Sequence, residues 1–407
     1  MVQFIETGPF DYEEYFSIAA QFLYKYQWIF CYNNTKFIRC GVLEQLPREW
    51  ITDLDTLSNE EFNHIPVGCI KDTWCDSFRE FLLQVKMLQV QYDTHENIDQ
   101  PHNRHKQKRK GINAKKAYEI DNLCSFIELE QFRKDATLFI DFGSGLGYLS
   151  ELIHERYGAK VLGIEGNATL VQTCNNRSSV STSKAVQYCH HYITDDSFGF
   201  IEQQCSDRFD NYPHRAAVVG LHACADLSIT AINCFLHCKW ATSLTIMPCC
   251  YHRMKPLDEK APNEFQNFPL SQELRTILLE EQDEAVRVGK LGSTLEEITV
   301  ENMLEQFKLL KQLECNTREC PWTDQHKDRM SALLQKYGPE GPKLAEYLEC
   351  LQTCLQSICE NVILLDRMCY MESEANRSSL KMRRKLVRLR DDGLSPRCFI
   401  FYASKDE

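Results

Sequence analysis

Short apolar runs alternate with amphipathic, helix-length segments from residue 116 to about residue 250. Apolar runs of about five residues between helices are typical of strands that are buried on both faces of a parallel sheet. The pattern predicts strands over 137–141, 160–165, 185–188, 216–221 and 243–247. It predicts helices between them over 148–156, 168–174 and 228–238. We therefore expect a doubly wound, mostly parallel α/β sheet that binds ligands at the carboxyl ends of its strands.

The segment before this region has a helical pattern. Aromatic and aliphatic residues recur at spacings of three and four between Tyr12 and Phe30, and a second stripe of this kind predicts a helix from Asp76 to Tyr92. Such stripes are typical of buried helix faces. We expect these helices to cap the sheet or to form a separate subdomain.

The last part of the chain predicts one long helix and a β-hairpin. Apolar residues from 344 to 365 keep a heptad-like spacing, which favours a single buried helix over a dimerisation helix. Two strands, over 381–390 and 398–403, flank a turn at Asp391-Asp392-Gly393 and predict an antiparallel hairpin that closes the sheet. We expect its basic first strand to face solvent at the sheet edge.

These patterns predict five segments. They are a helical N-terminal region (1–100), a basic linker (101–115), the α/β core (116–254), a charged helical insertion (255–345), and the long helix with the closing hairpin (346–407). The insertion follows the fifth predicted strand. That position suits a lid or a substrate-recognition element, and a passive surface elaboration is the alternative.

A glycine-rich turn follows the first predicted strand. The strand ends in Asp141, and the turn reads Gly143-Ser144-Gly145-Leu146-Gly147. Glycines at a strand-to-helix turn let backbone N–H groups come close to the polar end of a nucleoside ligand. The dinucleotide pattern would have glycine or alanine where this chain has Tyr148, and Asp141 would repel a phosphate. The turn therefore indicates a nucleoside ligand without a pyrophosphate.

Two carboxylates narrow the ligand further. Glu165 ends the second predicted strand, where it can accept hydrogen bonds from both hydroxyls of a ribose. Asp141 can receive the cationic amino group of a methionine moiety. The arrangement resembles the S-adenosylmethionine site of Rossmann-like methyltransferases, and S-adenosylmethionine is the cofactor we expect.

Two later strands end in residues that carry chemistry. The fourth continues into His222-Ala223-Cys224-Ala225-Asp226, and the fifth into Cys249-Cys250-Tyr251-His252. Adjacent strand ends would bring these side chains together. Methyl transfer requires that the acceptor be aligned and, if it is weakly acidic, that it lose a proton. His222, Asp226 or His252 could take that proton, and Tyr251 could stack on or hydrogen-bond a planar acceptor. Imidazoles and thiols also bind zinc, but the spacing matches no paired C-x-x-C knuckle, so we expect no metal. The simpler interpretation of Cys249 and Cys250 is packing below a cofactor pocket.

The composition limits the partner and the compartment. Acidic residues outnumber basic ones by 58 to 46, and the formal charge of −12 argues against a protein whose whole surface binds a polyanion. The 20 cysteines are too few for a disulfide scaffold of this length, and no apolar run is long enough to span a membrane. We expect a soluble protein of the cytoplasm or nucleus, with reduced cysteines and without membrane contact. Its length predicts about two to three domains.

One segment departs from this acidic average. Seven positive charges fall within residues 104–116, and no acidic residue interrupts them. Among them are Lys106, Lys108, Arg109 and Lys110. Lysines and arginines near phosphates release counterions, so this segment could guide an RNA without reading its sequence. Arg383 and Arg384 in the hairpin could extend the patch, and a solvated linker is the alternative interpretation.

Several motifs together resemble the methyltransferase-like protein 25 family, some of whose members are named ribosomal RNA adenine dimethylase domain-containing proteins. The matching stretches are Lys115–Ile120, Asp141–Ser150, Gly220–Ser228, Pro248–His252 and Val362–Arg367. The resemblance spans about residues 10 to 405. The Leu-His-Ala-Cys and Cys-Cys-Tyr-His elements are also similar to those of tRNA ribose-methylating enzymes that share this domain.

The resemblance implies an S-adenosylmethionine-dependent methyltransferase with a seven-stranded Rossmann-like sheet and a poorly defined acceptor. Two basic segments that flank the cofactor site favour a structured RNA, such as tRNA or rRNA, as that acceptor. A protein acceptor, favoured by the acidic net charge, is one alternative. A non-catalytic cofactor-binding scaffold is the other, because Met247–Tyr251 lacks the polar Asn-x-Pro-Tyr type of turn. The expected cofactor-binding residues are Glu119, Asp141, Gly143, Ser144, Gly145, Gly147, Glu165 and His191. The expected catalytic residues are His222, Asp226, Cys249, Tyr251 and His252.

Overall fold

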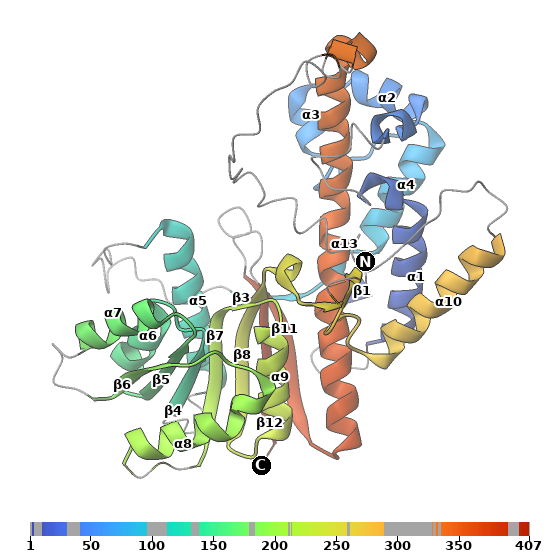
Figure 1. The fold of residues 1–407 in the computed structure, drawn as a ribbon. Helices are drawn as coiled ribbons and strands as arrows, with labels where there is room; N and C mark the ends of the chain where they lie inside the picture. Colours follow the sequence, from blue (N-terminus) through green and yellow to red (C-terminus); the bar gives the residue numbers. More distant parts are fainter. Residues whose placement is uncertain are drawn as a thin grey trace. The chain divides into compact units, whose positions relative to one another are not determined.

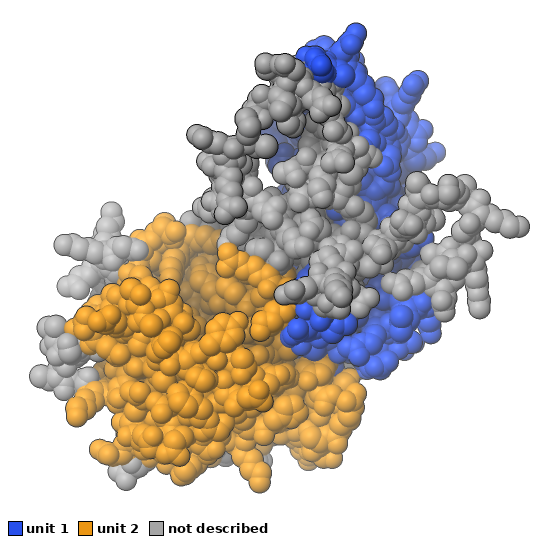
Figure 2. Space-filling model, viewed as in Figure 1, with its two compact units in different colours: residues 1–2, 11–90, 256–369 blue, residues 3–10, 91–255, 370–407 orange. Residues whose placement is uncertain are grey.

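A computed structural model describes most of the chain in two compact units. The described residues are 2–3, 10–30, 41–95, 112–131, 138–178, 184–210, 212, 214–258, 261–288, 328, 331–332, 335–389 and 399–406. Their side chains are described except at 2–3, 131, 178, 252, 258, 261–264 and 281–288. Unit 1 comprises residues 1–2, 11–90 and 256–369, and unit 2 comprises residues 3–10, 91–255 and 370–407 (Figure 2). Much of the predicted basic linker and of the charged insertion lies outside the described residues.

Unit 2 is built on an eight-stranded sheet (Figure 1). Its strands are β3 (Asp93–His95), β4 (Leu138–Phe142), β5 (Lys160–Glu165), β6 (Val186–His190), β7 (Ala216–Cys224), β8 (Ala241–Cys249), β11 (Met382–Leu389) and β12 (Phe399–Lys405). Across the sheet the order is β3-β11-β12-β8-β7-β4-β5-β6. The strands from β8 to β6 are parallel, whereas β12 is antiparallel to both β8 and β11. The predicted Rossmann-like methyltransferase sheet with its antiparallel closing hairpin is confirmed.

The sheet has one strand more than the seven expected. The helix predicted to reach Tyr92 ends at Met87 in α4 (Asp76–Met87), and β3 pairs in parallel with β11. Tyr92, directly before β3, packs edge-on against Phe399 of β12 with ring centroids 4.9 Å apart, so it packs on the sheet and is not part of α4. β3 covers β11 only over Val387–Leu389, so the expectation of an edge strand is wrong there. The basic residues Arg383, Arg384 and Lys385 pair with β12, and no other described strand pairs with them.

The sheet is buried on both faces. Phe139 of β4 belongs to the core that α5 (Ala114–Gln131) and α6 (Tyr148–Tyr157) form on one face. Leu138, Ile140 and Phe142 alternate with it and are also buried. Side chains on a strand alternate between faces, so β4 is apolar on both sides, as its continuous apolar run predicts. The remaining helices of the unit are α7 (Ala168–Ser178), α8 (Phe198–Arg208) and α9 (Leu227–His237).

Unit 1 is mainly helical. Its elements include α1 (Tyr12–Lys25), α2 (Arg48–Asp55), α3 (Asn59–Asn63), α4, β9 (Pro256–Asp258), β10 (Ala261–Phe265), α10 (Gln272–Val288) and most of α13 (Gly341–Arg377). The aromatic stripe of the first predicted helix is core, because Tyr26, directly after α1, packs 4.7 Å from Phe81 and 6.3 Å from Trp50 between ring centroids. Among the described residues, no helix is both long and apolar enough to cross a membrane.

A buried carboxylate ties α10 to α13 inside unit 1. Asp366 of α13 accepts hydrogen bonds from the Leu270 N–H (2.8 Å), the Ser271 N–H (2.8 Å) and the Ser271 hydroxyl (2.6 Å). Burial raises the pKa of Asp366 to about 6, while these donors partly oppose the shift. The three donors offset the cost of burying this carboxylate.

Removing one of these donors should weaken unit 1. We expect Ser271→Ala to lower the free energy of unfolding by about 1.5–3 kcal/mol, because it leaves a buried carboxylate with one hydrogen bond fewer. Chemical denaturation followed by circular dichroism measures the change. The exposed Thr52→Ala, which loses a hydroxyl bonded to the Arg48 carbonyl, should change stability by no more than about 0.5 kcal/mol. Equal losses in the two variants would contradict this role of Ser271.

Candidate functional site

The glycine turn connects β4 to α6 in a conformation that only glycine adopts easily. Gly143, Gly145 and Gly147 have φ values of +72°, +56° and +71°. The N–H groups of Gly143 and Ser144 donate to the Ile164 carbonyl at 2.9 and 3.1 Å, which attaches the turn to β5. L-residues with a Cβ avoid this region of φ, so the sequence pattern reflects a backbone requirement.

The surroundings of Gly145 and Gly147 differ. A Cβ at Gly147 would lie 2.1 Å from the Tyr188 hydroxyl oxygen, so this glycine is needed for packing against β6. A Cβ at Gly145 would meet no atom within 4 Å. Gly145 thus borders open space at the carboxyl end of β4, where a ligand can approach the backbone of the turn.

Glu165 holds the glycine turn from the end of β5. Its Oε2 accepts a hydrogen bond from the Gly145 N–H at 2.9 Å, and its Oε1 accepts one from the Asn167 N–H at 2.8 Å. A carboxylate offers about four lone-pair positions, so each oxygen can accept a further bond from a ribose hydroxyl. The structure brings the predicted ribose-binding residue into direct contact with the predicted cofactor loop.

Asp141 stands directly before the turn and is fully buried. The Ser150 hydroxyl, from the first turn of α6, donates to its Oδ2 at 2.6 Å. Burial raises the pKa of the Asp141 carboxyl to about 6, and the Ser150 hydrogen bond opposes that shift. Sequence reasoning missed Ser150, although its place in the first turn of the helix after the glycine loop was a usable signal.

The raised pKa of Asp141 predicts that cofactor binding depends on pH. The carboxyl is mostly protonated below about pH 6 and ionised above it, whereas the methionine amino group stays cationic up to about pH 7. If the ionised form receives that amino group, S-adenosylmethionine affinity should rise about tenfold from pH 5 to pH 7. Calorimetric titration at several pH values measures this dependence.

Asp141→Asn separates this effect from other titrations. Asparagine keeps the shape and can still accept the Ser150 hydrogen bond, but it has no proton to lose in this range. We expect weaker binding with a flat pH profile. A profile as steep as that of the unaltered protein would show that another group titrates.

The predicted catalytic residue His222 lies on β7 beside a buried acid. Glu119 of α5 is 2% exposed, and its Oε2 lies 3.3 Å from Nε2 of His222. Lys115 lies 3.9 Å from the other Glu119 oxygen. A carboxylate at Nε2 favours the tautomer with the proton on that nitrogen, which leaves Nδ1 as an acceptor. The sequence predicted Glu119 as a cofactor ligand and gave no indication of this pair.

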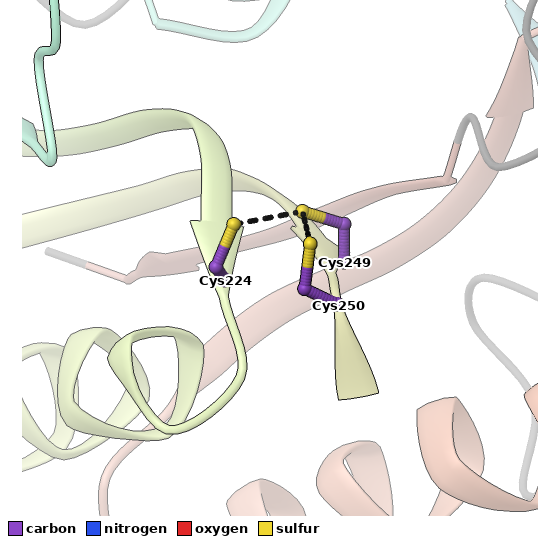
Figure 3. A group of neighbouring side chains, drawn as sticks. All are labelled: Cys224, Cys249 and Cys250. Carbon is purple, nitrogen blue, oxygen red and sulfur yellow. Dashed lines mark hydrogen bonds between the residues drawn. The ribbon is translucent and has the colours of Figure 1, made fainter. Parts of the chain in front are cut away.

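Three thiols converge where β7 and β8 end (Figure 3). The sulfur of Cys249 lies 3.2 Å from that of Cys224 and 3.6 Å from that of Cys250, and 3.9 Å from Nδ1 of His222. The pKa of Cys224 is raised to about 11, because the contact with Cys250 and burial outweigh the lowering contact with Cys249. The pKa of Cys249 is raised by both neighbouring thiols and by burial. Cys249 is therefore a neutral thiol at pH 7 and not a thiolate nucleophile.

Of the other predicted catalytic residues, Asp226 and Tyr251 have described side chains, and both make contacts within the unit. Asp226 immediately precedes α9, and its Oδ2 accepts a hydrogen bond from the backbone N–H of Lys255 at 2.9 Å. The Tyr251 ring is fully buried and its hydroxyl donates to the Pro248 carbonyl at 3.4 Å, so it presents no face for stacking. His252 lies in a short turn of 3₁₀-helix, and its side chain is outside the described part of the structure.

His191 follows β6 and packs within the unit. Its Nε2 lies 2.8 Å from the Ser197 hydroxyl, and its ring stacks on Phe200 with centroids 4.2 Å apart. The backbone N–H of His191 donates to the backbone carbonyl of Glu165 at 3.1 Å. This bond holds the chain after β6 beside the predicted ribose-binding residue. These contacts make His191 a positioning residue in this structure.

The predicted basic patch is described only in part. Lys106, Lys108, Arg109 and Lys110 lie outside the described residues. Arg383 of β11 is exposed, but Arg384 forms an ion pair with Glu372 and only 11% of its side chain is exposed. Arg384 thus has a partner within its own unit, and of the two arginines predicted to extend the patch Arg383 is the exposed one.

Comparison with known proteins agrees with this geometry. Residues 115–256 match a family model described as a methyltransferase domain. The match assigns this segment, about a third of the chain, to a methyltransferase domain. It contains the glycine turn, Glu165, the Glu119–His222 pair and the three thiols. S-adenosylmethionine is consistent with such a domain as its cofactor, as the sequence predicted.

Solved structures match the chain at low identity. A geranyl diphosphate methyltransferase in complex with GPP and sinefungin is 13% identical, with 33% of this chain and 44% of that chain covered and a TM-score of 0.24. The N-terminal domain of EvdMO1 with SAH bound is 17% identical, with 31% of this chain and 48% of that chain covered and a TM-score of 0.22. The methyltransferase domain of bacterial CtHen1 is 8% identical, with 70% of this chain and 97% of that chain covered and a TM-score of 0.27. The chain spans about half the length of the first two, and these likenesses carry no conclusion about an acceptor.

Proposed function

We propose that this protein transfers a methyl group from S-adenosylmethionine to a structured RNA. The main support for methyl transfer is the glycine turn. It borders open space at Gly145, and the Gly145 N–H donates a hydrogen bond to the Glu165 carboxylate. β4 has β5 on one side and β7 on the other, so the turn lies where the strand order reverses. Ligands of doubly wound sheets bind at this position.

The cofactor would be held by three features of this turn. Its backbone N–H groups would face the polar part of the cofactor, Glu165 would accept the ribose hydroxyls, and Asp141 would receive the amino group. S-adenosylmethionine supplies an activated methyl sulfonium when bound. The protein then has to align the acceptor and, for a weakly acidic one, take its proton.

His222 is the residue we propose as the proton acceptor. It lies at the end of β7, next to β4, and Glu119 stands at its Nε2. A buried carboxylate behind a histidine orients the ring and stabilises the imidazolium that forms when Nδ1 takes a proton.

The choice of RNA rests on charge. The chain carries a formal charge of −12, yet seven positive charges lie within residues 104–116, a stretch that ends in the first turn of α5, the helix that carries Glu119. Such a segment would bring a polyanion to the edge of the methyltransferase domain by counterion release. The resemblance to RNA-modifying families supports the same acceptor class.

Transfer of labelled methyl to cell fractions tests the proposal. Purified protein is incubated with S-adenosylmethionine carrying a labelled methyl group and with RNA, protein or small-molecule fractions from cells that lack the protein. We expect label in RNA, sensitive to ribonuclease. Label in protein or in small molecules alone would contradict the RNA acceptor. Cofactor binding without label in any fraction would favour a scaffold and contradict turnover.

A further inference from the structure

The thiols of Cys224, Cys249 and Cys250 form a compact group at the carboxyl ends of two paired strands (Figure 3). Cys224 is the last residue of β7 and Cys249 the last of β8, and the two are partners in the register of the parallel pair. All three sulfur atoms lie within 4.8 Å of one another, and none of the three is in a disulfide. Packing as small apolar residues does not require three sulfurs to meet at one point.

The backbone at both strand ends produces this convergence. Consecutive side chains of a strand point to opposite faces, so Cys249 and Cys250 would ordinarily diverge. Cys250 has a φ of +54°, which ends β8 and turns its sulfur to 3.6 Å from that of Cys249. Ala225, after Cys224, also has a positive φ, and its N–H donates to the Cys249 carbonyl at 2.8 Å. The two strand ends are thereby tied together with their thiols on one side.

We propose that Cys224, Cys249 and Cys250 bind one Zn²⁺ ion. Zn–S bonds of about 2.3 Å in a tetrahedron place two sulfurs roughly 3.8 Å apart. The sulfur separations of 3.2 and 3.6 Å are close to that value, and small side-chain rotations reach it. Thiolates are the ligands that zinc prefers among protein side chains. Each thiol that binds the ion loses its proton to solvent.

Three thiols supply three of the four ligands of a tetrahedral zinc site, which would leave the fourth position for water or an acceptor atom. His222 is outside the group of three, although its Nδ1 lies 3.9 Å from the Cys249 sulfur. Its other ring nitrogen, Nε2, lies 3.3 Å from Oε2 of Glu119. A zinc site with three protein ligands and an open position is the arrangement of catalytic zinc. The proposal goes beyond methyl transfer and does not rest on it.

Metal binding by the full-length chain tests this site. The protein is reduced with a phosphine, freed of metal with a chelator and titrated with Zn²⁺ against a coloured competing chelator. We expect one tightly bound Zn²⁺ per chain. Replacement by Co²⁺ should give the visible bands of tetrahedral cobalt and the near-ultraviolet thiolate-to-cobalt band. A reduced protein that binds no Zn²⁺, or a cobalt complex without the thiolate band, would overturn the proposal.

Serine variants locate the ion. Cys224→Ser, Cys249→Ser and Cys250→Ser should each weaken Zn²⁺ binding by at least about 100-fold, since each removes a direct ligand. Cys189→Ser is the matched control, because Cys189 is a buried cysteine near the carboxyl end of β6 in the same sheet. Equal Zn²⁺ affinity in all four variants would place the ion elsewhere and overturn the assignment. Should a variant fail to fold, the cobalt spectrum of the unaltered protein still decides the ligand type.

Discussion

Replacing Gly145 by arginine is expected to abolish S-adenosylmethionine binding while the domain stays folded. The position borders open space in which a Cβ would meet no atom within 4 Å, so a long side chain can be placed there without disturbing the core. That side chain would fill the volume next to the turn's N–H groups and add a positive charge where the cationic cofactor binds. We expect affinity to fall at least about 100-fold, equivalent to about 2.7 kcal/mol. Isothermal titration calorimetry measures the loss.

Gly145→Ala is the matched control. It shares the unfavourable φ of +56° with the arginine variant, which costs roughly 1–2 kcal/mol of stability, but it adds only a methyl group. Its affinity should therefore stay within about tenfold of the unaltered protein. If the arginine variant binds the cofactor as tightly as the alanine variant does, the cofactor does not bind at this turn.

The glycine turn could be predicted from the sequence because its determinants are local. A strand, three glycines and a helix are consecutive in the chain, and the positive φ values at Gly143, Gly145 and Gly147 are a property of that short stretch. Glu165 was also predictable, because the end of the next parallel strand lies beside the end of the first. At the glycine turn and at Glu165, the spacing of apolar residues and the turn residues both indicate a strand that ends at the ligand-binding edge of the sheet.

The contacts that sequence reasoning missed join distant parts of the chain. Glu119 precedes the sheet in α5, and no local pattern indicates that it meets His222 at the end of β7. β3 was missed because the helical spacing of its predecessor continues through Tyr92, whose burial against Phe399 depends on the last strand of the chain. Tyr251 reads as an exposed aromatic after a strand, yet its ring is fully buried. Tertiary packing outweighs local pattern at each of these residues.

Loss of His222 is expected to slow methyl transfer with little change in cofactor affinity. A positioned general base contributes about 100- to 10,000-fold to a rate, so His222→Ala should lower kcat for RNA methylation within that range. Glu119→Gln keeps the size of the side chain but removes the charge that stabilises the imidazolium. We expect it to lower kcat by about 10- to 100-fold, because the base remains present but less well supported. Single-turnover methylation assays at saturating cofactor measure both rates.

The double variant shows whether the two residues act together. Contact between Glu119 and His222, at 3.3 Å, predicts that combining the substitutions costs little more than His222→Ala alone, because Glu119 acts through the histidine. His237→Ala, an exposed histidine at the far end of α9, controls for the loss of an imidazole in the same unit. Rates that multiply in the double variant would mean that Glu119 acts independently of His222. A control as slow as His222→Ala would contradict the proposed base itself.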